Sequence, residues 1–190
     1  MAGVVKPGLG YIDTEITRAI LPTLPCWRAL GATPNILTSL GYITSSMCLY
    51  ALYHRQFMLA VIFLTMRTYF DYADGLFARK YAMVTCMGDI YDHVGDWVFI
   101  SGILYLFAFS KYPENVKKTF LYILLVVGIL SVIQTGCIEH EYHDESMAET
   151  TISRLRHVCP VPMKQFIKLF DGGSIFIVII ILASVFCSYK

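Results

Sequence analysis

Five stretches of mainly apolar residues fill most of this chain, and each has the length of about 20 residues that a helix needs to cross a lipid bilayer. We predict these helices at residues 36–54, 56–78, 88–110, 115–137 and 171–189. The sequence is 56% hydrophobic, and its mean hydropathy is +0.59. These features predict an all-α integral membrane protein, a bundle of transmembrane helices, and exclude a soluble domain.

The segment before the first stretch has a different pattern. Its apolar residues recur at helical spacing between charged ones, at Ile12, Ile16, Ile20 and Leu24. Residues 10–31 therefore predict an N-terminal amphipathic helix that lies on the membrane interface and is divided by Pro22 and Pro25. We divide the chain into a juxtamembrane segment, 1–33, and a transmembrane domain, 34–190.

The positive charges predict an orientation. With the N-terminus in the cytosol, nine Lys and Arg residues fall on the cytosolic side of the five stretches and five fall on the far side, in agreement with the positive-inside rule. The turn between the second and third stretches then faces the cytosol. The net charge is +1 and no basic run occurs, so nothing in the composition predicts a nucleic-acid partner.

Two further features limit what the chain can be. Its six cysteines are scattered without a CxxC pair, so they predict neither a zinc ribbon nor a disulfide framework. Residues 138–168 form the only long polar stretch. His140 and His143 lie three apart in it, which is not the spacing of the HExxH zinc motif. We interpret the start of this stretch as a solvated helix end, the alternative being part of a substrate-recognition lip. Its later part is interpreted as a basic segment along the lipid surface.

Five aspartates lie close together within residues 71–96. Asp71 and Asp74 are three apart, Asp92 and Asp96 are four apart, and Asp89 lies three before Asp92. Each set lines one face of its own helix, and a short turn between the two helices would bring the acidic faces together. Carboxylates at membrane depth are seldom kept without a role. Hard divalent cations, Mg²⁺ first, are the natural occupants of such a site.

The same residues carry a resemblance to a known family. The pattern D-x2-D-G-x2-A-R-x8-G-x3-D-x3-D is formed by Asp71, Asp74, Gly75, Ala78, Arg79, Gly88, Asp92 and Asp96. It resembles the signature of the CDP-alcohol phosphotransferase family at every fixed position. The resemblance implies transfer of a substituted phosphate from a CDP-linked alcohol to a second alcohol, with release of CMP and dependence on Mg²⁺ or Mn²⁺, held as two ions.

The resemblance also implies a role for each residue. The metal ligands would be Asp71, Asp74 and Asp92, with Asp96 as general base and further metal ligand. The CDP moiety would be contacted by Gly75, Ala78, Arg79 and Gly88. Asn35 and Thr38 lie three apart at the start of the first span, where they either cap that helix or face the site as a further part of the CDP pocket.

Three neighbouring residues leave alternatives open. Arg67 lies four before Asp71 and would supply a counter-charge to it or reach a lipid phosphate; we favour the counter-charge. Asp89 is interpreted as a solvated or supporting carboxylate. His93 gives the DHxxD form seen in choline and ethanolamine phosphotransferases of this family, where it would assist proton removal; the alternative is a histidine that only packs and donates a hydrogen bond.

The sequence does not fix the substrates. One branch of the family uses CDP-diacylglycerol and a small polar alcohol, and the other uses CDP-choline or CDP-ethanolamine and diacylglycerol. The chain length favours the first branch, and the DHxxD form favours the second. A phosphorylated acceptor would need basic residues such as Arg154 and Arg156 beside the site.

The resemblance has consequences beyond the reaction. Family members of this size usually have six spans, so we expect five to six here, in a homodimer among membrane lipids. The location would be the endoplasmic reticulum in a eukaryote and the plasma membrane in a prokaryote. A divalent-cation transporter is the alternative from another class, but it would have little use for Gly75, Ala78 and Arg79.

Overall fold

A computed structural model describes residues 4–146 and 152–188, with the side chains of 143–146 left out. The N-terminal part consists of α1 (Tyr11–Ile20), η1 (Leu21–Thr23) and α2 (Leu24–Ala29). Long helices follow at α3 (Pro34–Tyr53), α4 (Phe57–Lys80), α5 (Cys86–Ala108) and α6 (Glu114–Ser146). The C-terminal part contains η2 (Ser153–Val158), η3 (Val161–Met163), α7 (Lys164–Ile167) and α8 (Gly172–Ser188).

The five predicted stretches correspond to α3, α4, α5, α6 and α8, so their type and order are confirmed. Local signals explain two of the helix starts. Thr33 precedes Pro34 and its hydroxyl accepts a hydrogen bond from the Ile36 amide at 3.4 Å. The Thr85 hydroxyl accepts one from the Gly88 amide at 3.0 Å at the start of α5. These are N-caps, which satisfy amides that the helix itself leaves without partners.

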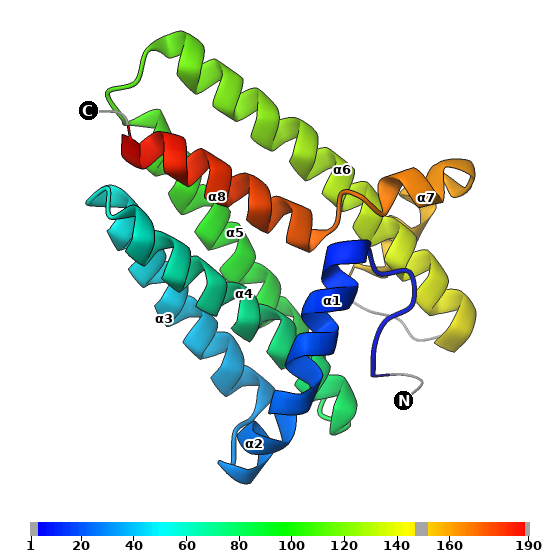
Figure 1. The fold of residues 1–190 in the computed structure, drawn as a ribbon. Coiled ribbons are helices and arrows are strands. Elements are labelled where there is room, and N and C mark those ends of the chain that lie inside the picture. The colour runs from blue at the N-terminus through cyan, green and yellow to red at the C-terminus, as the bar shows by residue number, and fades with distance from the viewer. Residues whose placement is uncertain (1–3, 147–151, 189–190) are drawn as a thin grey trace.

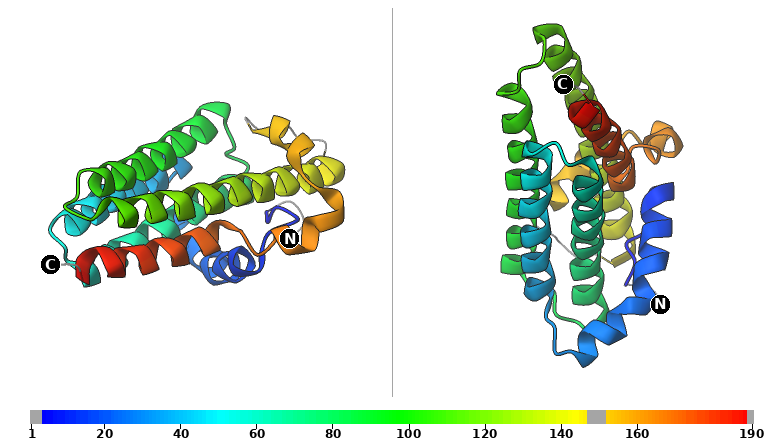
Figure 2. Two further views of the ribbon diagram at one scale, coloured as in Figure 1. Left: turned by 90° about the horizontal axis from the view of Figure 1, so that it is seen from above. Right: turned by 60° about the vertical axis from the view of Figure 1, so that its left-hand side comes forward.

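The long helices run alternately up and down. α3 packs along both α4 and α5, and α8 packs against α4 and α6, as Figure 1 shows. The two views in Figure 2 show α1 lying beside α4 and near the start of α8. The turns α3–α4 and α5–α6 and the end of α8 gather at one end of the bundle, and the turn between α4 and α5 lies at the other.

Membrane-spanning character is clearest in α3 and α6. By length and composition, Pro34–Tyr53 and Glu114–Tyr142 could each cross a membrane, and the bent pair Val161–Ile167 and Gly172–Ser188 could form a third span. α4 and α5 carry the charged residues of the motif, and α8 has 17 residues. The apolar window of α6 has a mean hydropathy of 2.3 and only 17% of it is buried. A helix this apolar with so little protein around it fits a lipid environment.

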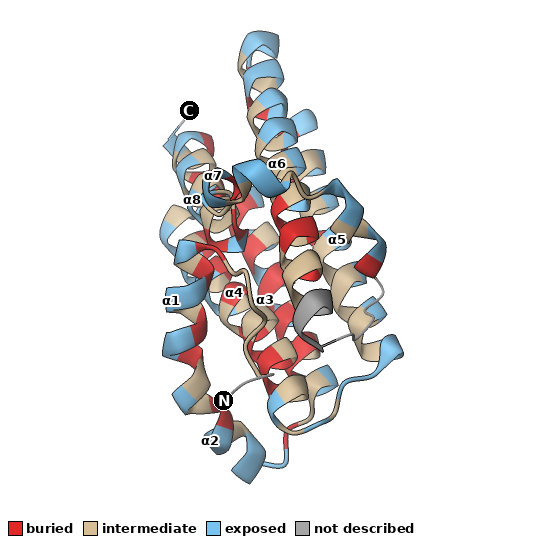
Figure 3. Ribbon diagram, turned by 90° about the vertical axis from the view of Figure 1, so that its right-hand side faces the viewer, coloured by how far each residue is buried: buried red, intermediate tan, exposed pale blue. Residues whose placement is uncertain are grey.

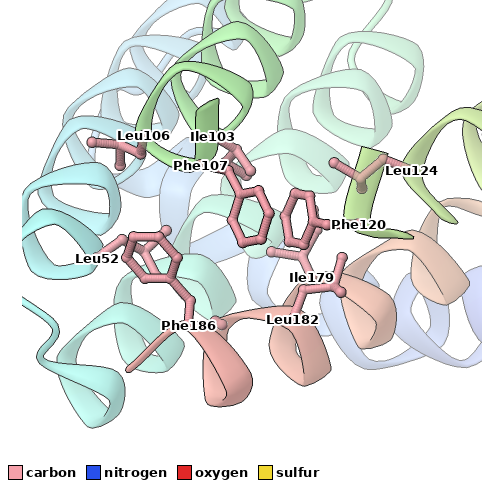
Figure 4. Close-up of a pocket in the computed structure, with 10 residues that line it drawn as sticks. Leu52, Ile103, Leu106, Phe107, Phe120, Leu124, Ile179, Leu182 and Phe186 are labelled. Atoms are coloured by element: carbon pink, nitrogen blue, oxygen red, sulfur yellow. The ribbon is translucent and has the colours of Figure 1, made fainter. Parts of the chain in front are cut away.

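Apolar side chains close the bundle at the end opposite the α4–α5 turn. The rings of Phe107 and Phe120 are stacked at 3.5 Å between centroids, with Phe186 at 5.9 Å from Phe107. Figure 4 shows these rings around a small cavity of about 20 Å³, with Leu52 and Leu182 nearby. This end is a packed core, and the burial map in Figure 3 shows buried residues continuing along the inner faces of the helices.

The first turn of α1 is tied to the first turn of α8 by Asp171, which is 1% exposed. Its carboxylate accepts hydrogen bonds from the Ile12 amide at 2.9 Å and the Asp13 amide at 3.1 Å. It also accepts one from the Ser174 amide of α8, at 2.9 Å. One side chain therefore caps the N-termini of two helices that are far apart in the sequence.

Asp13 of α1 makes the reverse connection. Its carboxylate accepts hydrogen bonds from the Gly173 amide at 2.7 Å and the Gly172 amide at 3.3 Å, and from the Tyr72 hydroxyl of α4. Burial is the largest influence on the Asp13 carboxyl and raises its pKa. The nearby Asp171 charge also raises this pKa and the Tyr72 hydrogen bond lowers it, so that the pKa is raised overall. The two reciprocal caps hold α1 against α4 and α8. The division of the N-terminal helix at the prolines is confirmed, while its interfacial position stays a prediction.

The cysteine prediction was wrong in one respect, because Cys137 and Cys159 form a disulfide. The two residues are 22 apart in sequence, and they meet because η2 folds back onto the end of α6. This spacing carries no local signal, so only the tertiary contact shows the pair. α6 also continues past the predicted end at 137 to Ser146. The side chain of His143 lies outside the described residues.

Candidate active site

The four motif aspartates face each other across two neighbouring helices. Asp71 and Asp74 lie on α4, and Asp92 and Asp96 lie on α5. All four line one small cavity together with residues of α3. Asp74 is the most deeply buried, at 4% exposure, and accepts a hydrogen bond from the Thr38 hydroxyl at 2.5 Å. The predicted convergence of the two acidic faces is therefore present.

A guanidinium lies among these carboxylates. Arg67 pairs with Asp71 at 3.3 Å and also forms an ion pair and hydrogen bond with Asp96 of the opposite helix. Its guanidinium carbon lies 4.8 Å from the centre of the Phe99 ring. The predicted counter-charge role toward Asp71 is confirmed. The bond to Asp96 was not foreseen, because it depends on how α4 and α5 are each placed against α3.

The donor set fits a hard divalent cation by its chemistry. Four carboxyl groups face one guanidinium, and carboxylate oxygens are preferred ligands of Mg²⁺. Within residues 4–146 and 152–188, no three His, Cys, Asp or Glu side chains come close enough together to hold a metal ion. The metal assignment therefore stays a prediction that rests on residue type and charge.

A second cavity, of about 100 Å³, adjoins the aspartates at the α4–α5 turn. Its lining includes all six residues that were predicted to contact CDP, namely Asn35, Thr38, Gly75, Ala78, Arg79 and Gly88. We call this the turn cavity. The six residues come from α3, α4 and α5, so the fold brings together residues that the sequence separates. Their contact with a nucleotide remains a prediction.

Two glycines allow the close approach of neighbouring atoms in the turn cavity. A Cβ on Gly88 would lie 2.9 Å from the Thr85 hydroxyl and 3.3 Å from the Asn35 amide oxygen. A Cβ on Gly75 would lie 3.2 Å from a guanidinium nitrogen of Arg79. A side chain at Gly88 would displace the Thr85 hydroxyl that caps α5, whereas one at Gly75 would crowd the Arg79 guanidinium.

A third and larger cavity, of about 430 Å³, lies between α4, α5, α6 and α8. We call this the central cavity. Its polar part includes the four aspartates, Arg67 and Arg79, and its apolar part includes Leu64, Phe99, Ile100, Phe176 and Ile179. The central and turn cavities share Lys6, Asp74, Gly75, Arg79, Asp89 and Asp92. A cavity with a charged part and an apolar part can accommodate an amphiphilic ligand.

His93 and Asp89 lie beside the motif residues. His93 Nδ1 lies 3.7 Å from a carboxylate oxygen of Asp92, and His93 lines the central cavity. Asp89 lines both cavities. Both residues are therefore positioned at the site, but no observation gives either a chemical role. Arg154 and Arg156 belong to η2 and line neither cavity.

Sequence reasoning missed the contribution of the N-terminal residues that precede α1. Lys6 lines both cavities, and the Val4 carbonyl accepts a hydrogen bond from Arg79 Nε at 2.8 Å. It also missed Gly95 on α5, where a Cβ would overlap the ring of Tyr42. A glycine between two motif aspartates was the available signal for Gly95. A lone lysine near the N-terminus gives no comparable signal.

Comparisons with known proteins agree with this geometry. Residues 31–188 match a family model described as CDP-alcohol phosphatidyltransferase. The chain is 32% identical over 102 residues to a protein of Aquifex aeolicus (strain VF5) named CDP-diacylglycerol–glycerol-3-phosphate 3-phosphatidyltransferase. This alignment covers 53% of the chain and 56% of the relative, so the chain spans little more than half the length of that relative. No solved structure matches the chain significantly.

Proposed function

The chain belongs to the CDP-alcohol phosphatidyltransferase family, and from this premise we propose that it transfers a phosphatidyl group from CDP-diacylglycerol to a small polar alcohol and releases CMP. The observation that carries the proposal is the junction of the two cavities, where the motif aspartates meet the residues assigned to CDP. The name of the Aquifex relative supports CDP-diacylglycerol as donor and a phosphorylated polyol as acceptor.

The charges at the site support a metal-dependent reaction. We propose that Asp71, Asp74, Asp92 and Asp96 hold Mg²⁺ or Mn²⁺, as two ions, which would neutralise the diphosphate as its charge develops. Arg79 would donate hydrogen bonds to phosphate oxygens, since its guanidinium is planar and permanently charged. Asn35 and Thr38 would complete the wall around the nucleotide.

Asp96 is the proposed general base. It would take the proton from the acceptor hydroxyl as that oxygen attacks the phosphorus and the bond to CMP breaks. Arg67 keeps the Asp96 carboxylate between α4 and α5, so Arg67 would position the base without contacting substrate. His93 lies at the edge of the central cavity and would assist this proton transfer.

The central cavity favours a lipid donor. Its apolar lining between α5 and α8 could receive the beginning of an acyl chain, while the phosphate lies at the aspartates. We further propose five spans, α3, α4, α5, α6 and α8, with α1 on the interface and the site facing the cytosol. A homodimer is proposed on family grounds alone. The site would face the cytosol at the endoplasmic reticulum of a eukaryote or the plasma membrane of a prokaryote.

The test is CMP release by purified protein in detergent with Mg²⁺. CDP-diacylglycerol is offered with glycerol 3-phosphate, inositol and serine, and CDP-choline or CDP-ethanolamine with diacylglycerol. We expect CMP release only in the reactions in which CDP-diacylglycerol is the donor. Release only with a CDP-aminoalcohol would move the protein to the other branch. Transport of a divalent cation by a protein that does not bind CDP would instead support the transporter alternative.

A further inference from the structure

Residues 4–9, here called the N-terminal strap, cross the site between α4 and α6. Two hydrogen bonds hold the strap from opposite sides. Arg79 Nε of α4 donates to the Val4 carbonyl at 2.8 Å, and Gln134 Nε2 of α6 donates to the Gly8 carbonyl at 3.0 Å. The two hydrogen bonds hold the backbone of the strap on either side of residue 6.

That side chain is Lys6. Its ammonium lies 2.6 Å from a carboxylate oxygen of Glu139 and 5.2 Å from the centre of the Tyr142 ring. Glu139 is 1% exposed, whereas the Lys6 side chain is 21% exposed. The exposed part opens into the cavities, because Lys6 lines both the turn cavity and the central cavity. The buried carboxylate therefore holds the lysine at the junction of the two.

We infer that Lys6 binds a phosphate group of a substrate at the junction of the turn and central cavities. An ammonium has three N–H donors, and Glu139 takes one of them within the part of the chain described. The remaining donors can reach a phosphate while the pair with Glu139 stays intact. Separating this buried carboxylate from the Lys6 ammonium would be costly, so Glu139 would act as a positioning residue for Lys6.

The junction holds two cations, Lys6 and Arg79, and three carboxylates, Asp74, Asp89 and Asp92. A phosphate would therefore bind here together with the metal ions proposed for the aspartates, which would offset the carboxylate charge. The basic residues that line the central cavity are Lys6, Arg67 and Arg79. Arg67 is engaged by the carboxylates of Asp71 and Asp96. Lys6 and Arg79 are the two that also line the turn cavity. A diphosphate or a phosphorylated acceptor at the junction would therefore meet these two cations.

This inference rests on the proposed function, and the experiment separates the two. The variants are Lys6→Met, which removes the charge, Lys6→Arg, which keeps it, and Lys80→Met as a matched control, because Lys80 is exposed and lines neither cavity. CMP release is measured while donor and acceptor are varied separately. Unfolding midpoints in detergent check that each variant is folded.

For Lys6→Met we expect KM to rise about 10-fold or more for the substrate whose phosphate it binds, since a hydrogen bond to a charged group is lost. Lys6→Arg should recover most of this change, and Lys80→Met should match wild type. A rise in the donor KM identifies the CDP diphosphate. A rise in the acceptor KM for glycerol 3-phosphate, without one for unphosphorylated glycerol, identifies the acceptor phosphate.

Wild-type activity with unchanged KM values for both substrates in Lys6→Met would overturn the inference and leave the proposed function standing. Lack of CMP release by wild type with every substrate pair would overturn the proposed function and the inference together. If Lys6→Met does not fold, Lys6→Gln replaces it, because a glutamine can still donate a hydrogen bond to Glu139. A KM rise in folded Lys6→Gln supports the inference, and unchanged KM values oppose it.

Discussion

The double cap made by Asp171 gives a strong stability prediction. Truncation in Asp171→Ala removes the acceptor for the Ile12 and Asp13 amides of α1 and for the Ser174 amide of α8. The site is buried, so water cannot easily replace the carboxylate. α1 and α8 would each lose an N-cap in a single substitution.

The magnitude follows from this count of partners. Loss of one N-cap costs about 1 kcal/mol, and an unsatisfied buried donor costs about 1–3 kcal/mol. The caps consist of these same amide hydrogen bonds, so the two costs are not added. Two buried caps at about 1–2 kcal/mol each predict a loss of about 2–4 kcal/mol in the free energy of unfolding for Asp171→Ala. Asp171→Asn should lose less, because one carbonyl oxygen remains as an acceptor.

The assay is equilibrium unfolding in mixed micelles of detergent and SDS, followed by circular dichroism. Glu15→Ala is the control, because Glu15 is an exposed acidic residue of α1 in a surface pair with Arg18, and such pairs contribute little. A loss below about 1 kcal/mol for Asp171→Ala, equal to that of an ordinary single cap, would refute the double-cap reasoning.

Four further outcomes are expected. Because the pKa of Asp13 is raised in the folded protein, its contribution to stability is present at low pH and is lost as pH rises through that pKa. The difference between the unfolding midpoints of wild type and Asp13→Asn should therefore fall as pH increases. Gly95→Ala should cost about 1–3 kcal/mol by overpacking against the Tyr42 ring, measured by SDS unfolding, and a wild-type midpoint would argue against that contact. Asp96→Asn should lower the rate of CMP release by about 10²–10⁴-fold with CDP binding retained; undiminished turnover would eliminate it as the base. Added Mg²⁺ should raise the unfolding midpoint of Arg67→Gln by more than it raises that of wild type, because the guanidinium that competes with the metal for the carboxylates is gone. The same Mg²⁺-induced rise in both proteins would show that Arg67 and the metal do not compete.

The sequence predicted the parts of the fold that depend on local pattern. Each long helix needs only a run of apolar residues of sufficient length and a signal at its end. Both features are local in the sequence, as Thr33 before Pro34 shows. The site was predictable for a similar reason. Spacings of three and four place aspartates on one face of a helix, and the short α4–α5 turn then brings the two faces together.

The features that were missed join residues far apart in the chain. Asp13 and Asp171 form a hydrogen bond although they are 158 positions apart in the sequence. Lys6 and Glu139 pair across 133 positions. Neither pair has a periodic or motif signal, because each joins the N-terminal part of the chain to a residue in or just before a C-terminal helix. The Cys137–Cys159 disulfide is the same case at shorter range. Spacing alone could not distinguish these pairs from isolated polar residues.

The missed contacts share one consequence for the site. The motif residues lie on α4 and α5, whereas the strap, α1, α6 and α8 supply the other walls of the central cavity. The reciprocal caps of Asp13 and Asp171 hold α1 and α8, and Glu139 and Gln134 hold the strap. The motif thus specifies the reacting groups, while the long-range polar pairs set the shape of the space in front of them. Substrate choice should therefore respond more to changes in those walls than to changes in the motif.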